Sequence, residues 1–319
     1  MGALLLAVVP GVGGAGEYLF PVDCTLGRDC FIQQHVDRDP GPGIADYRCG
    51  TLTYDGHKGT DVRLRDRAAM RAGVDVLAVA AGTVQGTRDG MADISVGDPR
   101  APSVKGRECG NGVRIRHDDG SSAQYCHLRK GSIRVGRGAR VEAGQALGAI
   151  GLSGATEFPH LHLTLRNAAG AVIDPMDTRL QDHACDLPER ATLWAEPIAY
   201  RPGGALTAGF ADRVPEYRAI KEGTAASARL APDAPGLVFW AHFFGVRKGD
   251  QLALHLTGPD GQTITQRASA MDRDRAQQFV AAGRRTRAPW PAGLYRGEAR
   301  LLRAGVVLST ITAEVTIGE

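Results

Sequence analysis

The sequence is poor in lysine and has no block of basic residues. Only five of its 38 basic residues are lysine, and 35 acidic residues nearly balance them, for a formal net charge of +3. Nucleic-acid-binding domains gather basic side chains on one face or along one helix. We therefore expect no nucleic-acid partner.

A long apolar run is also missing. The opening stretch, MGALLLAVVPGVGGAGEYLF, holds seven to nine consecutive apolar residues, whereas a membrane span takes about 20. This length is typical of the apolar region of a signal peptide with cleavage near Ala15 or Gly16, although no lysine or arginine precedes it. We predict a signal peptide over residues 1–16, no membrane span and a periplasmic or secreted location; a buried strand is the alternative.

No pair of cysteines has the C-x-x-C spacing of zinc ribbons or thioredoxin-like sites. The chain has six cysteines, an even number that favours disulfides in an oxidising compartment. Six cysteines allow 15 connectivities, and free buried thiols are the alternative. Closeness in sequence and an expected hairpin favour the pairs Cys24–Cys30 and Cys109–Cys126, which leaves Cys49 with Cys185.

Long helical periodicity is absent as well, while glycine is plentiful at 42 residues, so we predict an all-β chain. Residues 17–50 indicate an irregular, cysteine-containing N-terminal extension. In residues 51–176, short β-like runs alternate with glycine turns. A linker over residues 177–195 precedes residues 196–319, where turns every 8 to 12 residues are typical of an immunoglobulin-like β-sandwich.

The segment IRVGRGARVEAGQALGAIG, residues 133–151, resembles the hairpin of biotinyl or lipoyl carrier domains. Such carriers need an exposed lysine in the turn for attachment. No lysine lies between Lys130 and Lys221, so the likeness reflects shared strand architecture.

Two histidines stand one residue apart in the apolar run TEFPHLHLTLR. Side chains alternate between the faces of a strand, with a rise of roughly 3.3 Å per residue, so His160 and His162 share one face. One of them can bind a metal at about 2.0 to 2.1 Å while the other reaches a water beside it. Isolated H-x-H pairs are more often hydrogen-bonded sheet histidines, so the interpretation needs further residues.

A second motif, H-x-x-x-D, is formed by His57 and Asp61. In a straight strand their Cα atoms would be about 13 Å apart, too far to share a metal. Gly59 between them permits the chain to bend back, and a surface turn is the alternative. His127 follows in YCHL, at the end of the hairpin strand that returns after Val113 and Ile115, where a lone histidine is usually structural.

The order of these motifs matters more than any one of them. The chain reads H-K-G-T-D, G-N-G-V-x-I-x-H, Y-C-H-L, V-x-x-G-x-x-V-x-x-G-x-x-x-G-x-x-G, P-H-L-H and D-P. In this set, residues 51–176 resemble the M23 zinc metallopeptidases, the lysostaphin and LytM type of peptidoglycan endopeptidase. The resemblance implies a β-rich fold with a groove, zinc bound by three residues and two further active-site histidines. The zinc ligands would be His57, Asp61 and His162, and the further histidines His127 and His160.

Two departures from the family pattern stand out. The family often has a proline in the strand where this chain has GVDVLAVAAG, and Glu157 and Phe158 replace small residues beside the expected groove. Every expected ligand is intact, and the changes concern the substrate subsite.

The residues themselves account for a hydrolytic reaction. Two imidazoles and one carboxylate leave the fourth position of tetrahedral zinc to water, and the formal charge of about +1 lowers the pKa of that water toward 7. The sequence has no H-E-x-x-H motif, whose glutamate acts as the base in other zinc peptidases. Proton transfer therefore falls to His127 and His160, whose intrinsic pKa near 6.5 suits acid and base catalysis.

These observations predict an exported Zn²⁺-dependent endopeptidase that hydrolyses stems or cross-links of bacterial peptidoglycan. The alternative is a non-catalytic M23-like protein that binds the wall or activates another hydrolase, although all five positions are present. The C-terminal domain is expected to contact wall material or a protein, or to support the catalytic domain.

Overall fold

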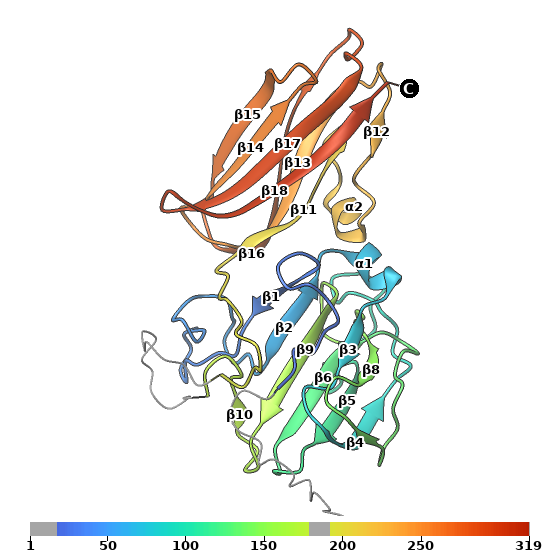
Figure 1. Cartoon of the computed structure of the whole chain (residues 1–319), viewed down its shortest axis with the longest axis vertical. Coiled ribbons are helices and arrows are strands. Elements are labelled where there is room, and N and C mark those ends of the chain that lie inside the picture. The colour runs from blue at the N-terminus through green and yellow to red at the C-terminus, as the bar shows by residue number, and fades with distance from the viewer. Residues whose placement is uncertain (1–17, 179–191, 319) are drawn as a thin grey trace, which may run out of the picture.

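The computed structural model describes residues 18–178 and 192–318 (Figure 1). The predicted signal peptide, most of the predicted linker and Cys185 lie outside the described residues. Within the described part of the chain, every helix is too short or too polar for a bilayer crossing.

The described residues are nearly all β, as predicted. The first half forms an eight-stranded antiparallel sheet in the order β1-β2-β9-β6-β5-β4-β7, with β10 paired to β9, beside a two-stranded sheet of β3 and β8. One short helix, α1, follows β2. The bounds are β1 Cys30–Gln34, β2 Thr60–Leu64, α1 Arg67–Ala72, β3 Asp75–Leu77, β4 Gly82–Arg88, β5 Asn111–Arg116, β6 Ser122–Leu128, β7 Arg140–Val141, β8 Ala146–Ala149, β9 His160–Arg166 and β10 Val172–Ile173.

The second half contains a three-stranded and a five-stranded sheet. Their orders are β11-β13-β16 and β12-β18-β17-β14-β15. The bounds are β11 Gly204–Ala211, α2 Tyr217–Glu222, β12 Arg229–Leu230, β13 Gly236–Val246, β14 Gln251–Thr257, β15 Thr263–Ala270, β16 Arg275–Arg285, β17 Gly293–Arg303 and β18 Val306–Ile317.

Each half has its own apolar core. Around β2, β5, β6 and β9 the core includes Val62, Ile115 and Leu161. In the second half, side chains from both sheets, such as Phe239 on β13 and Leu254 on β14, join one cluster, which is how the layers of a β-sandwich pack. The immunoglobulin-like topology and the domain boundaries stay predictions.

The predicted hairpin is confirmed. β5 and β6 pair antiparallel, with Val113 opposite Tyr125 and Ile115 opposite Ala123. Val113 and Ile115 are buried while Arg114 is exposed, so the alternation read from the sequence is the alternation between core and solvent.

The prediction that residues 17–50 are irregular is wrong in part, because β1 lies within them. β1 pairs antiparallel with β2 and forms an edge of the large sheet. Cys30, Phe31 and Ile32 are all buried. Neighbouring polar residues and the turn-rich flanks hid this short strand in the sequence.

Both testable disulfide predictions are confirmed. Cys24 is bonded to Cys30, and Cys109 is bonded to Cys126. The third predicted pair includes Cys185, outside the described residues.

The two halves meet where α1 and α2 lie side by side (Figure 1). Glu222 at the end of α2 accepts from Arg67 at 2.6 Å and from Arg71 at 2.9 Å. Gly223 follows with φ of 75°, and a Cβ there would come within 2.7 Å of the Ala68 Cβ. Glycine is therefore required for both the backbone conformation and the close approach of the helices.

Candidate metal centre

Two neighbouring strands position the first part of the site. Asp61 on β2 lies directly opposite His162 on β9, and opposed residues of an antiparallel pair project from the same face. The Nδ1 atom of His162 lies 2.8 Å from Oδ1 of Asp61. The register of β2 against β9 therefore brings two of the three predicted ligands, Asp61 and His162, together.

His57 reaches the same point from the loop before β2. Its Nε2 atom lies 3.2 Å from Asp61 Oδ1 and 3.2 Å from His162 Nδ1. Gly59 was expected to let the chain bend back, and the structure gives a further reason for it. A Cβ on Gly59 would lie 2.7 Å from the His162 ring and 2.7 Å from the Leu163 carbonyl oxygen, so only glycine leaves room for the ligand.

Hydrogen bonds fix which ring nitrogen of each ligand faces the centre. The His57 Nδ1 atom lies 2.6 Å from the backbone oxygen of His35, which can only accept, so Nδ1 carries the proton and Nε2 presents a lone pair when the ring is neutral. His162 Nε2 lies 3.0 Å from the Thr164 hydroxyl, which can accept its proton and leave Nδ1 free. Partners of this type orient metal-binding histidines.

The three inward atoms fit a tetrahedral zinc ion. Bonds of 2.0 to 2.1 Å at tetrahedral angles place ligand atoms about 3.3 Å apart, and the observed separations are 2.8, 3.2 and 3.2 Å. Two imidazoles and one carboxylate are also the donor types that zinc prefers. Lone pairs this close repel one another unless a proton or a metal ion lies among them.

The pKa values of these residues also indicate a site that favours positive charge. Burial lowers the pKa of His57, but the Asp61 carboxylate and hydrogen bonds outweigh it, so the pKa lies above its usual value. Burial raises the pKa of Asp61, yet the surrounding imidazoles hold that pKa well below its usual range. The Asp61 carboxylate is thus ionised, and the lone pairs of the surrounding imidazoles can bind a cation together with it.

The other two predicted histidines lie beside this centre. The ring centroids of His127 and His160 are 4.6 Å apart, and His127 is 6.0 Å from His162. His160 Nε2 lies 3.6 Å from Asp61 Oδ1. The structure therefore brings all five predicted site residues together.

His127 is held in an unusual backbone conformation. Its φ is 64°, a region that non-glycine residues seldom adopt. Its N–H donates to the Cys109 carbonyl at 2.8 Å, and its own carbonyl accepts from Gly151 at 3.0 Å. These two bonds offset the cost of the conformation, which turns the side chain out of the regular pleat at the end of β6.

Backbone carbonyls orient both neighbouring rings. His127 Nδ1 donates to Ser153 O at 2.7 Å, and His160 Nδ1 lies 2.9 Å from Phe158 O and 3.0 Å from the Thr156 hydroxyl. Burial, followed by the other imidazoles, holds the pKa of His127 well below its usual value. Burial likewise lowers the pKa of His160. Both rings are therefore neutral at pH 7, with Nε2 able to accept a proton.

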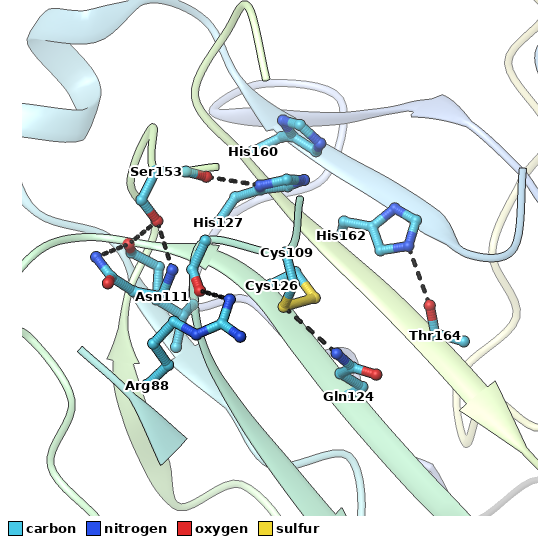
Figure 2. The surroundings of a disulfide bond; sticks show 12 residues. Arg88, Cys109, Asn111, Gln124, Cys126, His127, Ser153, His160, His162 and Thr164 are labelled. Atoms are coloured by element: carbon cyan, nitrogen blue, oxygen red, sulfur yellow. Dashed lines mark hydrogen bonds between the residues drawn. A yellow bond between two sulfur atoms is a disulfide. The ribbon is translucent and has the colours of Figure 1, made fainter. Parts of the chain in front are cut away.

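A buried polar network supports His127 from below (Figure 2). The Asn111 side chain donates to Met91 O at 2.8 Å and to Leu128 O at 3.1 Å, and its backbone N–H donates to Ser153 Oγ at 2.9 Å. Ser153 Oγ in turn donates to Leu128 O at 2.8 Å. The network ties the loop after β8 to the end of β6, where His127 sits.

Sequence reasoning missed these orienting groups. Thr164 alone carried a signal, because it lies two residues after His162 and so shares its face of the strand. The carbonyls of His35 and Ser153 carried none, since every residue has a carbonyl. Tyr54 was missed too: it is half exposed, and its ring lies tilted against that of His57, with the centroids 4.4 Å apart.

Residues 55–175 match the model of peptidase family M23. Among similar solved structures, the catalytic domain of a mutant prophage-encoded M23 protein, EnpA from Enterococcus faecalis, is 24% identical, with 51% of this chain and 96% of that chain covered and a TM-score of 0.33. The catalytic domain of lysostaphin from Staphylococcus simulans is 23% identical, with coverages of 38% and 77% and a TM-score of 0.27.

A third structure, the SpoIIQ–SpoIIIAH pore-forming complex, is 19% identical over 51% of this chain and 90% of that chain, with a TM-score of 0.36. The matched family segment contains all five residues of the site. This segment, residues 55–175, is thus similar to peptidase family M23.

Proposed function

We propose that this protein is an exported, zinc-dependent endopeptidase that hydrolyses peptide bonds in the stems or cross-links of bacterial peptidoglycan. The observation that carries the proposal is the convergence of His57 Nε2, Asp61 Oδ1 and His162 Nδ1 within 3.2 Å of one another. Two neutral imidazoles beside this set supply the acid and base groups that hydrolysis needs. The disulfides support an extracytoplasmic location.

His57, Asp61 and His162 would hold the zinc. When bound, zinc supplies Lewis-acid chemistry: it polarises the scissile carbonyl and lowers the pKa of water. We assign to the Nε2 atoms of His127 and His160 the removal of a proton from the attacking water and its delivery to the leaving amine. Both rings are already oriented by Nδ1 contacts to carbonyls, so they need not reorganise during the reaction.

The test uses the full chain and purified peptidoglycan. Metal analysis should find one zinc per chain, and digestion should release new amines that a chelator abolishes and added zinc restores. Mass spectrometry of the fragments would identify the bond cleaved. Zinc binding without amine release, together with retention on sedimented peptidoglycan, would instead favour the non-catalytic wall-binding alternative.

A further inference from the structure

A polar cleft of about 430 Å³ is lined by residues of both halves of the molecule and includes Glu157, three residues before His160. Its walls come from α1, from α2, from the loop between β4 and β5, and from the loop before β9. The charged side chains that line it include Arg67, Asp98, Arg100, Glu157, Arg218 and Lys221.

Most of these charges are already neutralised within the protein. Asp98 pairs with Arg100 at 2.8 Å, and Glu222 at the rim pairs with Arg67 at 2.6 Å. Among the described residues, no salt bridge involves Arg218 or Lys221. Lys221 lies 4.9 Å above the Tyr217 ring, and Arg218 contributes, after Arg100, to the lowered pKa of Asp98. Two cations of α2 thus remain without a carboxylate at bonding distance, against one unpaired carboxylate, Glu157, among the described residues that line the cleft.

The cleft and the candidate catalytic residues share one loop. Glu157 lines the cleft, and its carbonyl accepts from Ser95 Oγ at 3.5 Å. The next residue, Phe158, packs its ring 4.6 Å from that of His160. A peptide bound at His160 therefore needs only a short continuation past Phe158 to reach the cleft.

The end of α2, which carries the two cations, is fixed against α1. The Glu222 carbonyl accepts from Arg71 at 2.7 Å, and the close approach at Gly223 fixes the end of α2 against α1. The Arg63 guanidinium, buried beneath the interface, lies 4.6 Å over the Phe158 ring. The backbone positions of Arg218, Lys221 and Phe158 are therefore fixed relative to one another.

We infer that this cleft is a substrate subsite in which Arg218 and Lys221 bind a carboxylate of the wall peptide. The inference rests on the proposed function and extends it, because it makes the C-terminal half part of substrate recognition. Arginine and lysine form their strongest hydrogen bonds with carboxylates, and wall peptides carry free carboxylates on side chains and termini. Glu157 and Phe158, which depart from the family pattern, form the wall between the subsite and His160.

Binding is tested on the full chain after chelator treatment, so that hydrolysis does not interfere. Calorimetry would compare a peptidoglycan tetrapeptide that has free carboxylates with the same peptide after amidation. The double variant Arg218→Ala/Lys221→Ala should bind the carboxylate form roughly 5- to 30-fold more weakly and the amide form within about 2-fold of wild type. The matched control Lys248→Ala/Arg267→Ala removes the same charges from exposed positions outside the cleft and should change neither affinity.

Equal affinity of the wild-type chain for the two peptides, or no loss in the double variant, would overturn the subsite. On the zinc-loaded protein, the double variant should raise KM for the carboxylate peptide by the same factor and leave kcat within about 2-fold. A chain that prefers the carboxylate peptide but cleaves nothing would refute the proposed function and leave the subsite standing. Cleavage of both peptides without a preference for the carboxylate form would refute the subsite and leave the proposed function standing.

Discussion

Each half of the molecule has a buried histidine on a central strand, yet the two environments differ. On β9, His160 and His162 face Asp61 and two further imidazoles. On β13, His242 is 1% exposed, and among the described residues its ring forms one hydrogen bond, to the Tyr217 hydroxyl at 3.3 Å from Nε2. Burial, followed by Arg63 and Lys221, lowers the pKa of His242 to about 3. A buried imidazole alone is thus a neutral core residue, and the ionised carboxylate makes the difference.

The largest effect should come from removing that carboxylate. In Asp61→Ala, two imidazoles remain, which is too few for a stable zinc site, so zinc content and amine release should both fall to background. The control Asp55→Ala removes an exposed carboxylate from the same loop and should retain both. Full zinc occupancy in Asp61→Ala would show that other residues hold the metal.

The next largest effect should come from His127, which lies beside the ligands but is not one of them. His127→Ala should lower kcat by about 10²- to 10⁴-fold through loss of an acid or base group, while zinc content stays at the wild-type level. His255→Ala, at a half-buried position of β14, is the control for a histidine outside the site. Unchanged cleavage by His127→Ala would remove this residue from the reaction.

A smaller effect is expected at Thr164, which orients His162 without touching the centre. Thr164→Val keeps the shape of the side chain but removes the acceptor for Nε2, so zinc affinity should fall by roughly 10- to 100-fold in competition with a chelating dye. Thr164→Ser keeps the hydroxyl and should restore most of the affinity. If valine and serine behave alike, the hydroxyl does not orient the ligand.

The smallest effect on cleavage, within about 2-fold, is expected for His242→Gln, which instead tests the pH dependence of stability. Because the folded-state pKa lies below the ordinary value of 6.5, the unfolded state takes up more protons between about pH 6.5 and 3. This contribution to stability is complete above pH 6.5 and is lost as the pH falls.

Protonation of His242 in the unfolded state should lower the free energy of unfolding of the wild type by about 3 kcal/mol as the pH falls from 6.5 to 4. Urea unfolding at both pH values should show a smaller loss in His242→Gln. The same loss in both proteins would mean that His242 is not kept neutral by burial.

The sequence predicted what depends on residue type and short spacing. Alternation located β5 and β6, and the H-x-H pair placed His160 and His162 on one face. What it could not predict depends on contacts between distant segments. The buried Arg63 contradicts the usual exposure of arginine because Gln33 and Phe158, distant in sequence, surround it.

The cleft between the halves could not be predicted from the sequence for the same reason. Glu157 was recognised as a departure from the family pattern, but Arg218 and Lys221 lie in a segment with no motif. Their relevance depends on the contact of α2 with α1, to which Gly223 and the ion pairs of Glu222 contribute.

The strand β1 also restricts how the protein could be matured by proteolysis. Many secreted hydrolases are kept inactive by a leading segment that a processing protease cuts away. Here the segment before β2 supplies the His35 carbonyl that orients His57, and β1 covers the edge of β2. Trimming the chain past His35 would therefore remove the partner that orients His57 and leave an unpaired strand edge, so this segment is structurally part of the candidate metal centre.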